Sequence, residues 1–119
     1  MSLGNSLGQL GEKLAARYLV GKGYKILAIN KMLGHKEIDI IAQQGDLTVF
    51  IEVKTANSQS PVKPEEQLNA LKIHRLKKAV WQYCLEQRLN PNNIRADLVA
   101  ICLNETEKMA KVRHFENIF

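Results

Sequence analysis

Two neighbouring β-branched segments that carry acidic residues constrain the fold of this chain more than any other feature. Glu37 to Gln43 (EIDIIAQ) and Leu47 to Thr55 (LTVFIEVKT) have the composition of strands. Between them, Gly45-Asp46 is typical of a tight hairpin turn. If these two residues form the loop, Gln44 pairs with Leu47. The sequence therefore predicts an antiparallel hairpin in this register. A register shifted by two would move directly opposed residues to diagonal positions on the same face, and a bulge would break the pattern.

Counting outward from that pair brings four charged residues together on one face of the hairpin. Asp39 falls opposite Glu52, and Glu37 falls opposite Lys54. Directly opposed residues have Cβ atoms about 4.5–5.5 Å apart. Two facing carboxylates repel each other and lose hydration, so a shared proton or a divalent cation is needed to offset the cost.

Asp39, Glu52, Lys54 and a divalent cation are the parts needed to hydrolyse a phosphodiester bond. Lys54 supplies a positive charge that stabilises an anionic transition state or orients a nucleophile. A structural alternative stays open at this point: an edge hairpin with a Glu37–Lys54 ion pair and solvated acids. The pattern alone does not choose between a metal site and this ion pair.

The remaining chain predicts two helices and three further strands around the hairpin. Ser6 is the expected N-cap of the first helix, and Pro64 is expected to open the second. The full set is a helix over 6–23, strands over 24–32, 37–43 and 47–55, a polar loop over 56–63, a helix over 64–88, and strands over 95–103 and 110–115. The order αβββαββ predicts a single-domain α/β protein (1–119) with a mixed central sheet flanked by helices.

Charge is distributed unevenly along the chain. Of the net charge of +5, residues 54–95 carry eight basic and three acidic side chains, so the whole excess lies there. A local basic field favours a polyanionic partner, nucleic acid first, and a solubilising helix face is the alternative. In the second helix, Lys72 lies on the apolar stripe, where a lysine either snorkels to solvent or points at a neighbouring site.

Composition narrows the cellular setting. No apolar run approaches the ~20 residues of a membrane span, and no signal peptide is recognisable, so no membrane partner is expected. Cys84 and Cys102 have no paired spacing and lie in apolar segments. They are interpreted as buried thiols in a reducing cytosol, which predicts a cytoplasmic protein.

Several of these residues together resemble a known family. The Asp39…Glu52-x-Lys54 pattern, after a helix bearing Glu12, is similar to the PD-(D/E)XK or restriction-endonuclease-like nuclease fold. More narrowly, the chain resembles the YraN-like family, also called uncharacterised protein family 0102. The resemblance runs nearly from end to end through the following segments: Gly11-Glu12, Gly23-Tyr24, Asn30, Glu37 to Ala42, Phe50 to Thr55, Lys72, Arg75-Leu76, Asp97 to Val99, and Phe119.

The resemblance implies a Mg²⁺ or Mn²⁺ site formed by Asp39, Glu52 and the Val53 backbone carbonyl. Lys54 would be the catalytic lysine, Glu12 a further acidic ligand, and Glu37 an accessory residue. The expected function is a metal-dependent nuclease acting on DNA, including branched or processed DNA. The residues expected to hold nucleic-acid phosphates are Lys72, Arg75, Lys77 and Lys78.

The chain also departs from the family. Lys36 replaces the usual glycine, Ala56 replaces the usual arginine after the Glu-x-Lys-Thr run, and Ala96 replaces a common aromatic. The missing arginine removes a phosphate contact. Two alternatives therefore stay open: a catalytically weak or inactive nucleic-acid-binding module of the same fold, and a partner-binding scaffold. The resemblance also leaves room for a homodimer, although no dimer patch is readable.

Overall fold

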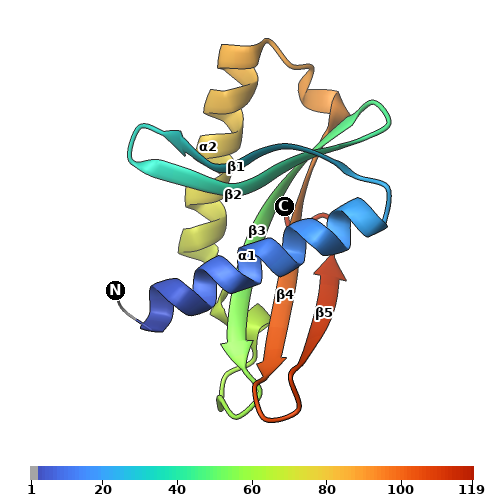
Figure 1. The fold of residues 1–119 in the computed structure, drawn as a ribbon. Helices are drawn as coiled ribbons and strands as arrows, with labels where there is room; N and C mark the ends of the chain where they lie inside the picture. Colours follow the sequence, from blue (N-terminus) through green and yellow to red (C-terminus); the bar gives the residue numbers. More distant parts are fainter. Residues whose placement is uncertain (1–2) are drawn as a thin grey trace.

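The computed structural model describes residues 3–119 (Figure 1). Its helices and strands follow in the predicted order, which confirms the α/β class and the layout of the sheet. Short 3-10 turns precede the second helix and the fourth strand. The bounds are α1 (Leu3–Gly21), β1 (Lys25–Leu33), β2 (Lys36–Gln44), β3 (Leu47–Asn57), α2 (Ala70–Gln87), β4 (Ile94–Asn104) and β5 (Met109–Phe115).

A mixed sheet in the order β1-β2-β3-β4-β5 forms the centre of the molecule. Only β3 and β4 run parallel, and α2 makes the crossover between them. Helix α1 crosses one face of the sheet and α2 covers the other (Figure 1). The core is accordingly divided into a cluster under α1, around Leu19 and Val99, and a cluster under α2, around Phe50 and Val80.

Both helices begin at positions different from those predicted. Helix α1 starts at Leu3, so Ser6 lies inside it and is not its N-cap. The segment from Pro64 forms only a 3-10 turn, after which the chain becomes extended. Helix α2 starts at Ala70 because the side chain of Asn69 accepts a hydrogen bond of 3.0 Å from the Lys72 backbone N–H.

The predicted hairpin register is confirmed near the turn, but the ladder of paired residues ends earlier than expected. Strands β2 and β3 pair from Gln44↔Leu47 to Ile40↔Ile51. Beyond Ile40 the ladder stops, so Asp39 does not pair with Glu52. Instead, a carboxylate oxygen of Asp39 (Oδ2) accepts a hydrogen bond of 2.8 Å from the Val53 backbone N–H. The acid thus replaces a backbone acceptor where the two strands separate.

The hairpin of β1 and β2 bends at the same point. Asn30 has a left-handed backbone (φ 53), and it lies across from Asp39 between the pairs Ile29↔Ile40 and Lys31↔Ile38. Asparagine tolerates this conformation better than most residues. Simple alternation is broken here: Ile38 packs in the α2 cluster, whereas Ile40 packs in the α1 cluster. The two isoleucines that flank Asp39 therefore pack in different layers of the core.

A buried charge network joins β4 to the end of the chain. Asp97 has no exposed surface, and its carboxylate accepts hydrogen bonds from the Arg95 side chain (2.8–3.1 Å) and the Asn117 backbone N–H (3.2 Å). The His114 ring nitrogen Nε2 lies 2.8 Å from the same carboxylate. Arg95 also donates to the Tyr24 hydroxyl at 2.7 Å. The carboxylate is therefore well compensated despite its burial.

The predicted buried thiols are only partly confirmed, since Cys84 is buried and Cys102 is half-buried; both are free. No helix within residues 3–119 is both long enough and apolar enough to span a membrane.

Helix α1 approaches β3 closely at Gly11. A Cβ atom at Gly11 would lie 1.8 Å from Thr55 Oγ1 and 2.9 Å from Thr55 Cβ. Rotating the threonine cannot relieve the second contact, so a side chain here would push the helix outward. Because Glu12 follows directly, this contact fixes the position of Glu12 relative to the sheet.

We expect Gly11→Ala to lower the free energy of unfolding by about 1–3 kcal/mol, the usual cost of overpacking. Gly8→Ala is the matched control in the same helix. A Cβ at Gly8 has no neighbour within 4 Å, so this change should raise the free energy by about 0.5–1 kcal/mol. Urea unfolding of both variants measures the difference. Equal stabilisation by the two substitutions would contradict a tight α1–β3 contact.

Candidate functional site

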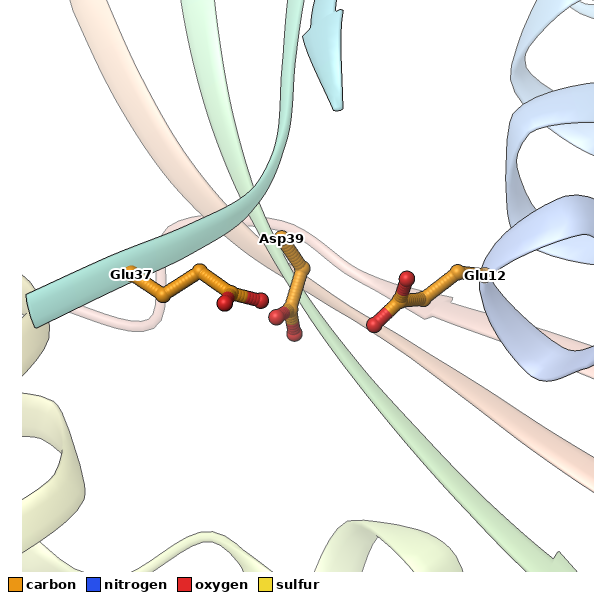
Figure 2. Close-up of side chains that lie close together, drawn as sticks. All are labelled: Glu12, Glu37 and Asp39. Carbon is orange, nitrogen blue, oxygen red and sulfur yellow. The ribbon is translucent and has the colours of Figure 1, made fainter. Parts of the chain in front are cut away.

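Three acids from two elements meet where β2 and β3 separate. Glu12 extends from α1, Glu37 and Asp39 come from β2, and Asp39 lies between the other two (Figure 2). One carboxylate oxygen from each lies within 4.8 Å of the others. Glu37 is exposed, whereas Glu12 and Asp39 are half-buried. Glu37, predicted as an accessory residue, therefore belongs to the tightest acidic cluster among the described residues.

Crowding and burial perturb two of these acids. Burial, and then the charge of Glu52, raise the pKa of Asp39 to about 7, against the opposing effect of the Val53 N–H hydrogen bond. Burial also raises the pKa of Glu12, although a side-chain hydrogen bond from Asn30 opposes the rise. Lys54 opposes the rise in the pKa of Asp39 but does not cancel it. Carboxyl groups held together with too little counter-charge are the condition under which a divalent cation binds favourably.

Glu52 and Lys54 lie beside this cluster and pair with each other. Lys54 Nζ is 3.0 Å from Glu52 Oε1, and both side chains are mostly buried. The cross-strand Glu37–Lys54 ion pair considered from the sequence does not form, because the β2–β3 ladder has already ended. Val53 approaches Asp39 through its backbone N–H. Glu52 stays close enough to Asp39 to raise its pKa.

A hollow of about 470 Å³ opens next to Glu37, Glu52 and Lys54. Its other lining residues come from the β1–β2 turn and from α2. Lys72 points into the hollow and approaches Lys54, whose charge, together with burial, lowers the pKa of Lys72. Two neighbouring ammonium groups favour an anion between them. The hollow is completed by His35, Lys36, Arg75 and Leu76.

The structure separates the four cationic residues predicted to contact nucleic acid. Lys72 and Arg75 line the hollow, but Lys77 and Lys78 do not. Both lie exposed on α2, and the Lys77 ammonium sits 5.3 Å from the centre of the Phe119 ring. His35, which is exposed, also lines the hollow and was not among the predicted site residues. Its position beside the β1–β2 turn could be seen in the sequence, but the packing of that turn against α2 could not.

Comparison with known proteins places the chain in a family. The family model described as "Uncharacterised protein family UPF0102" matches residues 11–101. The chain belongs to this family. The matched segment includes the three clustered acids, Glu52, Lys54 and Lys72.

Members of UPF0102 from several bacteria resemble the chain over nearly its whole length. A UPF0102 protein of Thermodesulfovibrio yellowstonii is 42% identical over 113 residues, covering 95% of both chains. A UPF0102 protein of Alkaliphilus oremlandii is 39% identical over 119 residues, covering 98% of this chain and 100% of the relative.

Among solved structures, SfsA of Pyrococcus furiosus in complex with Ca²⁺ is similar with a TM-score of 0.43 and 13% identity. The alignment covers 95% of this chain and 63% of the SfsA chain.

Proposed function

We propose that this UPF0102 protein is a metal-dependent nuclease of the restriction-endonuclease-like type, which hydrolyses phosphodiester bonds in DNA. The observation that carries the proposal is the junction of an acidic cluster with a cationic hollow. Glu12, Glu37 and Asp39 lie within 4.8 Å of one another, and Glu37 also lines the hollow that contains Lys54 and Lys72. Acidic oxygens beside cationic side chains suit a metal and a phosphate together.

The donor set fits a hard divalent cation. All three clustered groups offer carboxylate oxygens, which Mg²⁺ and Mn²⁺ prefer, and no sulfur or imidazole ligand is among them. Asp39, Glu12 and Glu37 would hold the ion, with Glu52 next to them. When bound, Mg²⁺ or Mn²⁺ supplies Lewis acidity toward the phosphate oxygens.

The chain's own residues supply the remaining electrostatics. Lys54 lines the hollow together with Glu37, and its ammonium stabilises the negative charge that grows on the phosphate in the transition state. Glu52 holds Lys54 in place at 3.0 Å. Lys72 and Arg75 on α2 bind the backbone phosphates that enter the hollow. Ala56, which stands in place of the usual arginine, is buried and offers no such contact.

A cleavage screen tests the proposal directly. The purified protein is incubated with Mn²⁺ and labelled duplex, single-stranded, flap and four-way-junction DNA, beside an Asp39→Asn variant. The proposal requires a cut product that the variant does not make. A wild-type protein that binds these substrates without cutting any of them would instead indicate a binding module.

Metal binding should be visible as stabilisation. We expect Mn²⁺ at 100 times its Kd to raise the free energy of unfolding by about 2.7 kcal/mol, because the ion binds only the folded site. Asp39→Asn should abolish the effect. Asp46→Asn is the matched control, since Asp46 is an exposed acid in the turn of the same hairpin. Thermal unfolding with and without Mn²⁺ checks this, and an equal metal response in Asp39→Asn would contradict the site.

A further inference from the structure

A second hollow adjoins the acidic cluster on the side opposite the cationic one. It measures about 440 Å³ and is lined by Gln9, Glu12 and Lys13 of α1 and by Ile29 and Asn30 of β1. Glu12 therefore borders this hollow, while Glu37 borders the cationic hollow. Since Asp39 lies between these two acids (Figure 2), a substrate crossing the cluster passes from one hollow into the other.

The lining of the second hollow offers three kinds of contact. Ile29 is an apolar side chain on the edge strand β1 and is 49% exposed. Gln9 and Asn30 are exposed amides, and Lys13 is an exposed cation. An apolar surface, amide groups and one cation match the base face, the base edge and the phosphate of a single nucleotide.

The backbone at Asn30 supports a functional interpretation. Its φ of 53 is a left-handed conformation within the continuous strand β1, and such residues inside regular structure tend to occur at functional sites. The Asn30 side chain also lies close enough to Glu12 to oppose the rise in the pKa of that acid, and both residues line the second hollow. The same residue therefore shapes the second hollow and positions an acid of the cluster.

We propose that this second hollow is a nucleotide subsite, which binds the nucleotide of an unpaired DNA strand on the far side of the bond to be cut. This inference rests on the proposed function and specifies its substrate class. The two hollows measure about 470 Å³ and 440 Å³, the size of pockets for small ligands, so each accommodates a nucleotide of one strand. Lys13 contacts a phosphate, and Ile29 lies against a base.

The test measures binding separately from cutting. All variants are made in a Lys54→Met background to prevent cleavage, and the probe is a fluorescein-labelled single-stranded oligothymidylate with Mg²⁺. Lys13→Ala should reduce the slope of log affinity against log salt concentration by about 0.7 in magnitude, which is the value for one phosphate of a single strand. Arg17→Ala, an exposed cation one helical turn away, is the matched control and should leave the slope unchanged. Ile29→Thr should weaken binding without changing the slope.

Nuclear magnetic resonance gives a second readout, since the backbone amide signals of Ile29 and Asn30 should shift when the oligothymidylate is added. Two results would overturn the subsite. One is that the affinity and its salt slope are the same in the parent, Lys13→Ala and Ile29→Thr proteins. The other is that Lys13→Ala and Arg17→Ala change the salt slope equally. Equally tight binding of a blunt duplex would overturn the unpaired-strand class. In each case cleavage by wild type would keep the proposed function. Failure of wild type to bind or cut any DNA would reject both proposals.

Discussion

Replacing Lys54 with methionine is expected to leave a protein that folds and binds Mn²⁺ and DNA but does not cut. Lys54 lines the cationic hollow, and its ammonium lies 3.0 Å from Glu52 Oε1. In the proposed nuclease it would stabilise charge that is present mainly in the transition state, so its loss should reduce turnover about 10²-fold or more while substrate affinity changes little. Lys54→Arg should not restore activity, because the planar guanidinium cannot occupy the position of the ammonium.

The decisive measurement for Lys54 is single-turnover cleavage of the substrate found by the screen. Lys78→Met is the matched control, since Lys78 is exposed on α2 outside the hollow. Circular dichroism and a Mn²⁺ titration show whether the variant is folded and retains the metal. Cleavage by Lys54→Met at the wild-type rate would mean that Lys54 has only a structural role, as the ion-pair partner of Glu52.

The second large effect concerns stability, at the buried carboxylate of Asp97. Asp97→Asn should lower the free energy of unfolding by about 3–5 kcal/mol, because it leaves the mostly buried Arg95 guanidinium without its main counter-charge. Glu116→Gln removes the other, exposed partner of the same arginine and should cost less than about 1 kcal/mol. Urea unfolding of the two variants measures this contrast. A loss under 1 kcal/mol in Asp97→Asn would contradict a strong buried pair.

The same carboxylate should make the free energy of unfolding depend on pH. Burial alone would raise the pKa of Asp97, but hydrogen bonds from His114, Arg95 and the Asn117 backbone outweigh it and hold the pKa below its ordinary value. A lowered pKa in the folded state stabilises the protein above the unfolded-state pKa of about 3.9. This stability is lost as the pH falls below that value. The acid limb of the stability–pH curve should therefore be flatter in Asp97→Asn than in wild type.

Local patterns predicted most of the fold, and the hairpin shows why. The Gly45-Asp46 turn and the alternating strand residues determine register over short distances, and the pairs from Gln44↔Leu47 to Ile40↔Ile51 follow it. The start of α2 was misplaced because Asn69, a better cap than the preceding turn, ends the extended segment after Pro64. Neither feature depends on distant parts of the chain, but the cap at Asn69 was not recognised in the sequence.

The site was harder to predict because its geometry depends on contacts between distant elements. The left-handed residue Asn30 lies opposite Asp39, and the ladder ends at Ile40, so Asp39 is not paired with Glu52. Glu52 nevertheless stays near Asp39, and Glu12 of α1 joins it. Alternation along the strand placed Glu37 on the same face as Asp39, but strand-pairing rules could not bring Glu12 to them, because that contact depends on how α1 packs on the sheet. The buried network around Asp97 was also missed: it joins residues far apart in sequence, and a lone acid in a strand does not reveal its partners.

The end of the β2–β3 ladder has a consequence for the mechanics of the protein. Beyond Ile40, the described backbone bonding gives way to one side-chain bond, from Val53 N–H to Asp39 Oδ2. A cation held by Glu12, Glu37 and Asp39 would join α1 to β2 beside this point. Occupancy of the site and local opening of the β1–β2 hairpin are then linked in one equilibrium. Binding of a cation at the acids would thus make local opening of the β1–β2 hairpin less frequent.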